Sequence, residues 1–206
     1  MERNSCTCAE ADPTDNPAPA DGKLLAMHAL ALLRGFARNN AWSNHRLHAA
    51  CAMLNHDELH APGTSFFPTI MKTLNHVLIV DWLYIDALAR EGRGRAVVED
   101  EEPFEDLARL RDAQRTSDRK LLAFVEHMTE DDIDAPVRIQ RADHVQIEQV
   151  CDVLLHLFQH QIHHRGQAHA LLAGTRVAPP QLDEFFLAEE LPLRRTELEE
   201  LGLPLT

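Results

Sequence analysis

A cluster of four histidines within nine residues constrains the fold of this chain more than any other feature. His156, His160 and His164 follow one another at intervals of four residues, and His163 precedes the last of them. On an α-helix, residues at this interval lie on one face, one turn apart. The same face continues an otherwise apolar stripe, so the segment predicts a helix whose imidazoles point toward a core. The stripe consists of Val153, Leu157, His160, His164, Gln167 and Leu171.

Imidazole nitrogens that point into a core need a partner, and a divalent metal is one that several of them can share. The spacing alone is weak evidence, because a chain with 13 histidines contains such pairs by chance; His56 and His60 form another, in a predicted loop. A hydrogen-bond network in the core is the alternative interpretation. A third ligand on a second helix favours the metal, and His76 is the candidate, since Val80 and Leu83 continue its face as an apolar one.

Composition excludes several classes of partner. The chain has 206 residues and a formal net charge of −13, which disfavours binding to nucleic-acid phosphates and to anionic membranes. Neither a signal peptide nor a membrane span is evident. The four cysteines do not form a disulfide framework, and Cys6-x-Cys8 lies in a polar tail. We therefore expect a cytoplasmic protein that acts on a small molecule.

Apolar periodicity predicts an all-α protein, an antiparallel four-helix bundle with a short C-terminal extension. Residues 1–20 are predicted to be a disordered tail, 21–175 the bundle, and 176–206 a tail with short helical turns that packs on the bundle. The stretch 133–145 is predicted to be an extended connection or a short hairpin. The polar middle of the third helix, Arg111–Arg119, is predicted to be largely exposed. The predicted helices are 21–54, 64–90, 104–128 and 146–172.

Three further residues are candidates for supporting roles around a metal. Asp81 is a possible base, or a salt-bridge residue on its helix. Gln167 suits a hydrogen bond to substrate or to a bound water, and His156 a hydrogen bond to a ligand or an alternative ligand position. Arg165 is most simply a surface or interface ion-pair residue. His28, His45 and His48 are weaker ligand candidates because their neighbours are polar.

The order of the motifs resembles the DinB/YfiT-like family of proposed metalloenzymes. The motifs are Asn40-Ala-Trp42-Ser-Asn44-His-Arg-Leu47, then Thr73-Leu-Asn-His76-Val-Leu, then the histidine run that ends His164-Arg-Gly-Gln167. The likeness covers about residues 22–175. The chain departs from the family in its N-terminal tail and in Gln159, where relatives often have Asn.

The resemblance implies a four-helix bundle, usually a homodimer, with one divalent metal on His76, His160 and His164. All-nitrogen ligation suits zinc, nickel, iron or cobalt. Three neutral ligands leave a coordination position open, as in catalytic zinc sites. Members of the family transfer low-molecular-weight thiols, so the resemblance implies an S-transferase or isomerase. A metal-dependent hydrolase, a non-catalytic metal-binding stress-response protein and a metal-free interaction bundle are the alternatives.

Overall fold

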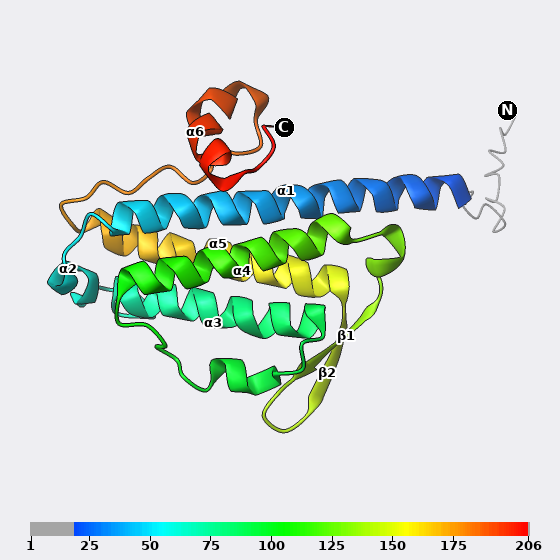
Figure 1. Cartoon of the computed structure of the whole chain (residues 1–206), viewed down its shortest axis with the longest axis horizontal. Coiled ribbons are helices and arrows are strands. Elements are labelled where there is room, and N and C mark those ends of the chain that lie inside the picture. The colour runs from blue at the N-terminus through cyan, green and yellow to red at the C-terminus, as the bar shows by residue number, and fades with distance from the viewer. Residues whose placement is uncertain (1–18, 206) are drawn as a thin grey trace, which may run out of the picture.

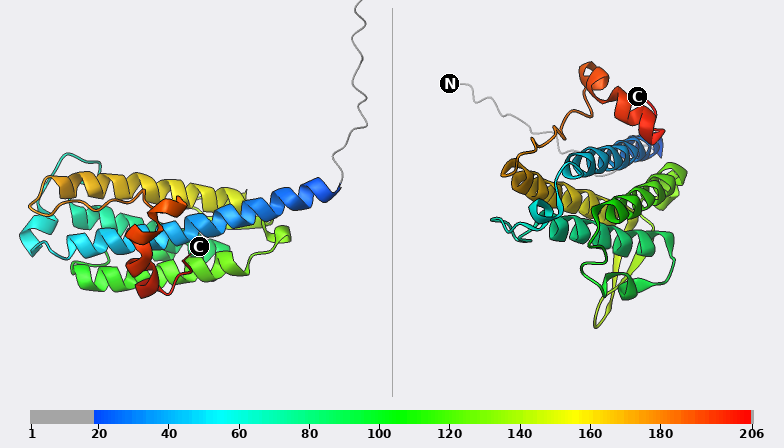
Figure 2. Two further views of the ribbon diagram at one scale, coloured as in Figure 1. Left: turned by 90° about the horizontal axis from the view of Figure 1, so that it is seen from above. Right: turned by 60° about the vertical axis from the view of Figure 1, so that its left-hand side comes forward.

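Four long helices form the body of the molecule in the computed structural model, which describes residues 19–205 (Figure 1). α1 and α3 each pack against both α4 and α5. Seen nearly end-on, the four helices surround a common core, and the C-terminal segment lies outside α1 (Figure 2). The long helices are α1 (Pro19–Cys51), α3 (Ile70–Ala89), α4 (Leu107–His127) and α5 (Val150–Ala173).

Shorter elements connect the long helices. The α-helices are α2 (His56–His60) and α6 (Leu191–Leu201), and the 3₁₀ helices are η1 (Gly94–Val98), η2 (Glu130–Asp132) and η3 (Ala188–Glu190). The strands β1 (Pro136–Gln140) and β2 (Val145–Gln149) form an antiparallel hairpin. Between residues 19 and 205 no helix is long and apolar enough to cross a lipid bilayer.

The helix directions differ in part from the predicted antiparallel bundle. α1 runs antiparallel to α4, and α3 runs antiparallel to α5, as predicted (Figure 1). However, α3 and α4 run in the same direction, because the connection 90–106 leads the chain back along the bundle before α4 begins (Figure 1). This long connection is a crossover of the kind that some bundle topologies contain.

Local chemistry explains where the helices begin. α3 starts at Ile70, later than the predicted 64, because Pro68 disfavours a helical conformation at Phe67 and the Thr69 side chain caps the helix by accepting from the Lys72 N–H at 3.1 Å. α5 starts at Val150 rather than 146, because residues 145–149 pair with β1. Of the two forms expected for 133–145, the structure contains the hairpin. The predicted tail, with Cys6 and Cys8, lies outside the described residues, except that Pro19 and Ala20 begin α1.

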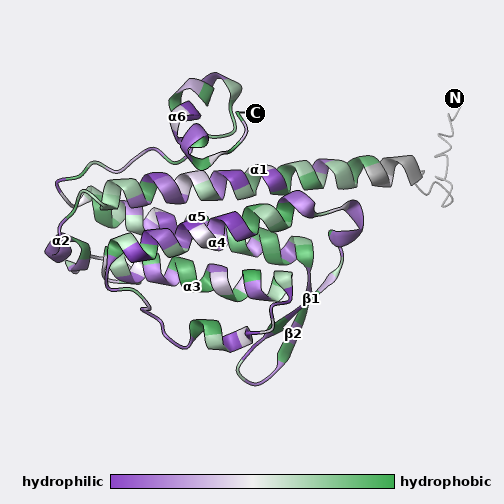
Figure 3. Ribbon diagram, viewed as in Figure 1, coloured by the Kyte–Doolittle hydropathy of each residue, from purple (hydrophilic) through white to green (hydrophobic). Residues whose placement is uncertain are grey.

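The core consists of two apolar clusters with a polar layer between them. One cluster lies at the hairpin end of the bundle and includes Leu33, Ile85 and Leu154; the other lies at the α2 end and includes Leu47 and Leu74. Hydrophilic stretches interrupt the hydrophobic ones along the long helices (Figure 3). The buried polar residues of the layer are Asn40, Ser43, Asn44, Asp81, Gln114, Ser117, Asp118, Gln161 and Arg165.

The polar middle of α4 is therefore not largely exposed, contrary to the prediction for Arg111–Arg119. Gln114, Ser117 and Asp118 are buried, with 1%, 2% and 6% of their surface exposed. They continue the inward stripe of Leu110 and Leu121 at helical spacing, so they face the bundle, where other polar groups meet them. The C-terminal segment packs on the outer side of α1. A separate apolar cluster, in which Trp42 contacts Phe185 and Leu198, holds it there.

Candidate metal centre

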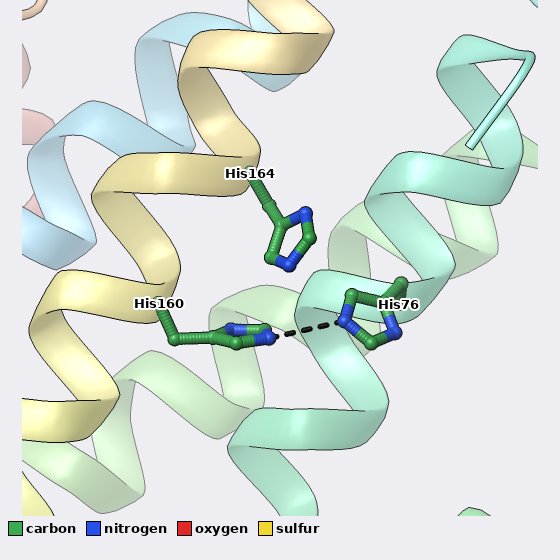
Figure 4. Close-up of side chains that lie close together, drawn as sticks. All are labelled: His76, His160 and His164. Atoms are coloured by element: carbon green, nitrogen blue, oxygen red, sulfur yellow. Dashed lines mark hydrogen bonds between the residues drawn. The ribbon is translucent and has the colours of Figure 1, made fainter. Parts of the chain in front are cut away.

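Three histidines from two helices meet in the seam between α3 and α5. His76 comes from α3, and His160 and His164 come from α5, and their imidazoles point toward one another (Figure 4). One nitrogen from each ring lies within 4.8 Å of the other two. His76 Nε2 and His160 Nε2 are 3.0 Å apart. The structure thus brings together the three residues that the sequence analysis selected as ligands.

The helices place these side chains by simple geometry. His160 and His164 are one turn apart on α5, and their ring centroids are 4.3 Å apart. α3 packs along α5, which brings His76 opposite them, with its ring centroid 4.5 Å from that of His164. The buried neighbours Leu74 and Val77 anchor α3 in the core, so that His76 lies half-buried at its edge.

An aromatic side chain covers one side of the cluster. The centroid of the Phe67 ring lies 4.3 Å from that of His76 and 5.5 Å from that of His164. The loop that carries Phe67 is closed by a 2.7 Å hydrogen bond from the Gly63 N–H to the Pro68 carbonyl. A Cβ at Gly63 would overlap the end of the Leu171 side chain of α5, so any other residue at position 63 would require that side chain to move.

Burial keeps the three imidazoles neutral. Desolvation, reinforced by the neighbouring His164, lowers the pKa of His76 to about 4. Desolvation and the surrounding histidines lower the pKa of His160 to about 3. Desolvation also lowers the pKa of His164, although the hydrogen bond with Gln167 acts in the opposite direction. At neutral pH each ring therefore keeps a nitrogen lone pair that can bind a cation.

Gln167 fixes the tautomer of His164. Its amide oxygen Oε1 lies 2.8 Å from His164 Nδ1, and an amide oxygen can only accept, so Nδ1 carries the proton and Nε2 keeps its lone pair. The amide nitrogen of Gln167 lies 3.1 Å from Nε2 of His163, to which it can donate. Gln167 therefore forms hydrogen bonds with His164, a proposed ligand, and with the neighbouring His163.

The cluster fits a divalent cation better than it fits a hydrogen-bond network. Each neutral imidazole has one N–H, and that of His164 is already used by Gln167. His160 Nε2 faces His76 Nε2, while the buried His160 Nδ1 has no hydrogen-bond partner among the residues from 19 to 205. Each ring keeps one lone pair, and a divalent cation is a partner that the three rings could share.

The other candidates are distributed around the cluster. His156 is exposed; its ring centroid lies 6.3 Å from that of His160 and 5.2 Å from that of Tyr84, beside a cavity of about 240 Å³. Asp81 lies behind the cluster, inside the bundle, with 1% of its surface exposed. Its carboxylate accepts hydrogen bonds from the amides of Gln114, at 2.6 Å, and of Gln161.

The prediction that Arg165 is a surface or interface residue is wrong. Arg165 follows His164 by one position, about 100° around the helix, so it faces the polar layer and only 4% of its surface is exposed. Its guanidinium donates to Oδ1 of Asn40 and, at 3.0 Å, to Oδ1 of Asn44. The Asn44 amide in turn donates to Asp118 at 2.9 Å. The charged groups of the layer are thus linked through neutral amides.

Burial controls the charges in this layer. Desolvation and the nearby Asp118 raise the pKa of Asp81 to about 8, and desolvation raises the pKa of Asp118 to about 7. Desolvation lowers the pKa of Arg165 to about 10, although both carboxylates oppose this. The guanidinium stays charged at neutral pH, while the two carboxylates hold more protons than they would in water.

Comparisons with known proteins agree with this architecture. The sequence model of the DinB family matches residues 27–195. The fold is similar to the crystal structure of a DinB-like protein from Bacillus cereus ATCC 10987, with a TM-score of 0.56 and 15% sequence identity over 71% of this chain and 94% of that one. A search of the curated proteins finds no match. The family resemblance inferred from the motifs is confirmed.

Proposed function

This chain belongs to the DinB family, and on that premise we propose that it is a metal-dependent enzyme whose divalent cation is held by His76, His160 and His164. The observation that carries the proposal is the convergence of three neutral imidazoles, with one nitrogen from each ring within 4.8 Å of the other two. Within residues 19–205 the cluster offers three ligands, and three-ligand sites with an open position are typical of catalytic rather than structural metals.

The chemistry that such a centre supplies is Lewis acidity. A divalent cation on three neutral ligands lowers the pKa of a thiol or of a water molecule. Gln167 would keep His164 in the tautomer that presents Nε2, and Phe67 would exclude water from one side of the cluster. His156, exposed beside the 240 Å³ cavity, is placed to receive a proton from a substrate that enters there.

We favour S-transfer with a low-molecular-weight thiol as the reaction. Among the described residues, the group that can hold a cation contains no carboxylate, and Asp81 is turned into the core. A thiol needs no strong base, because it loses its proton far more readily than water does. The homodimer and the small-molecule substrate expected from the family remain predictions.

Hydrolysis of a small substrate is the second candidate, and the position of His156 supports it. A hydrolase needs a general base that can take a proton from water, and His156 is the exposed imidazole nearest the cluster on the cavity side. Incubation of a panel of small electrophiles with and without added thiol separates the two candidates. Mass spectrometry detects an S-conjugate in the first case and a hydrolysed product in the second.

The proposal is tested by the metal content and stability of tag-free protein. We expect one zinc, nickel or iron ion per chain in the wild type, and a stabilisation of about 2.7 kcal/mol when the free ion is 100-fold above its Kd. His160→Ala should lose both the ion and the stabilisation. His156→Ala, an exposed histidine one turn away on the same helix, is the matched control and should keep both. Equal responses of wild type and His160→Ala would overturn the assignment.

A further inference from the structure

A second hollow, distinct from the histidine cluster, lies between the C-terminal end of α3, the η1 segment and the hairpin. Its volume is about 760 Å³, which is within the range of small-molecule sites. Its nearest residue on the face of α3 that carries His76 is Leu83, seven positions further on, or about 10 Å along the helix. We call it the arginine cleft, because it is lined by Arg90, Arg93, Arg95 and Arg138.

The charge of the arginine cleft is opposite to that of the whole protein. The chain carries a net charge of −13, yet Asp86 is the one acidic residue among the described residues that line the cleft. Asp86 is already neutralised: its carboxylate accepts from the Arg93 side chain at 3.2 Å and from the backbone N–H groups of Arg93 and Gly94 at 3.0 and 2.7 Å. An anion that enters the cleft therefore meets little opposing charge from it.

Three of the four guanidiniums make no close ion pair within the described part of the chain. Arg93 pairs with Asp86 and with Glu91, whereas Arg95 and Arg138 make no ion pair with any residue between 19 and 205. Arg90 makes none either, although Asp132 lies near enough for the charge of Arg90 to act on it. Guanidinium groups bind carboxylate, phosphate and sulfonate groups through paired hydrogen bonds. Several of them around one hollow, each free to donate, are a pattern suited to an anionic ligand.

An apolar wall faces these charges. Val145 and Ile147 lie on one face of β2 and remain 39% and 59% exposed, and Ile147 pairs directly with Arg138 on β1. Leu83 of α3 lines the same hollow. A ligand with an apolar body beside its anionic group would cover these side chains, which water now contacts.

The backbone that presents the arginines is already ordered. Asp86 holds the turn after α3 through the two backbone N–H groups of Arg93 and Gly94. Gly94 has a φ of 55°, and a Cβ there would lie 3.2 Å from the Gln140 Cβ, so the turn packs closely on β1. A fixed wall reduces the entropy that binding must overcome.

From the hollow, its unpaired guanidiniums and its apolar wall, we propose that the arginine cleft binds a small organic anion with an apolar body. The site is separate from the metal centre, and it requires no metal.

The probe is naphthalene-2-sulfonate, with uncharged naphthalene-2-methanol as its matched control, titrated by calorimetry and by ¹⁵N–¹H spectra of the full chain. We expect the sulfonate to bind with a Kd below about 1 mM, to shift the amides of Gly92, Gly94 and Arg95, and to bind at least about tenfold more tightly than the alcohol. 2-Naphthoate and phenyl phosphate, tested in parallel, show which anionic group the cleft prefers.

Arg95→Ala and Arg138→Ala should each weaken the sulfonate about five- to tenfold, and Arg138→Lys should weaken it less. Arg195→Ala, which removes an exposed arginine from α6, should have no effect. These arginines are exposed, so thermal unfolding should be unchanged in every variant. Equal affinity for the sulfonate and the alcohol, equal effects of Arg138→Ala and Arg195→Ala, or shifts confined to amides elsewhere would each overturn the proposal.

Discussion

On α5, adjacent residues belong to the histidine cluster in the seam and to the polar layer, yet the two regions satisfy their polar groups in opposite ways. His160 precedes Gln161, and His164 precedes Arg165; the first of each pair faces the seam and the second faces the bundle interior. In the seam, Nε2 of His76 faces Nε2 of His160, and His160 Nδ1 has no partner among residues 19–205. In the layer, carboxylates, amides and a guanidinium link four helices through hydrogen bonds.

The difference shows how the burial of a polar group determines the partner that it needs. A fully buried charge must be paired within the protein, since water does not reach it. The layer has two carboxylates for one guanidinium, and burial raises the pKa of both, so it tends to retain a proton. A proton on Asp81 adds a donor to a layer in which the buried amide oxygens of Gln114 and Gln161 lack one. The histidine cluster lies nearer the surface, so solvent can supply a partner for its nitrogens.

Removal of the guanidinium should have the largest effect on stability. Arg165→Met leaves Asp81 and Asp118 without their buried counter-ion, and we expect a loss of about 3–5 kcal/mol in the free energy of unfolding. Urea denaturation of the metal-free protein measures it.

Arg119→Met is the control for that experiment. Arg119 is exposed on α4, so its loss should change stability by less than about 0.5 kcal/mol. Addition of Asp118→Asn to Arg165→Met should recover part of the loss, because it removes one uncompensated carboxylate. A loss below about 1 kcal/mol in Arg165→Met would show that the layer is not electrostatically coupled.

A substitution beside the histidine cluster should weaken metal binding without lowering stability, unlike a substitution in the polar layer. Gln167→Ala removes the acceptor that fixes the His164 tautomer, and we expect the affinity for zinc or nickel to fall about 10- to 100-fold. The stability of the metal-free protein should change by less than about 0.5 kcal/mol. Competition with a chromophoric chelator measures the affinity. Gln159→Ala, exposed on the same helix, should bind metal like the wild type; if Gln167→Ala does so too, the hydrogen bond has no role in binding.

The pH dependence of stability should be the smallest effect and should come from the layer. The pKa values of Asp81 and Asp118 rise from 3.8 in the unfolded chain to about 8 and about 7 in the folded one, so the folded state binds more protons. The stability they contribute is complete below about pH 4 and is lost as the pH rises through 7 to 8.

The histidines act in the opposite direction but in a lower range of pH. Their pKa values fall from 6.5 to about 3 for His48 and His160 and to about 4 for His76. The stability that they contribute therefore rises with pH and is complete by about pH 7. Between pH 7 and 8.5 the stability of the metal-free protein should therefore decline, by up to about 1.4 kcal/mol per pH unit for one proton. Asp81→Asn should flatten this decline in urea titrations, whereas exposed Asp152→Asn should not. Identical slopes for wild type and Asp81→Asn would exclude Asp81 as the titrating group.

The long helices and the histidine cluster were accessible from the sequence because their signals are local. Apolar spacing marks each helix, and the interval of four residues places His160 and His164 on one face. The selection of His76 needed the resemblance as well as its apolar neighbours. The arginine cleft was not accessible, because it brings η1 and the hairpin together from segments about 45 residues apart in the chain.

The polar layer was missed for a different reason. Arg165 and the middle of α4 are charged or polar, and such residues are usually exposed. A usable signal was nevertheless present: Leu107, Leu110, Gln114, Asp118 and Leu121 follow one helical stripe. Polar residues that interrupt an apolar stripe in register were thus a sign of buried polar groups. Their partners could not be identified, because Asn40 and Arg165 are 125 positions apart.

That separation has a consequence for the synthesis of the protein. The two buried carboxylates are translated with α3 and α4, and the guanidinium that compensates them is translated only with α5. A nascent chain that has emerged from the ribosome as far as α4 would have to bury Asp81 and Asp118 without a counter-ion. We therefore expect the first three long helices to remain loosely associated on the ribosome and to close into the native bundle only when residue 165 has emerged.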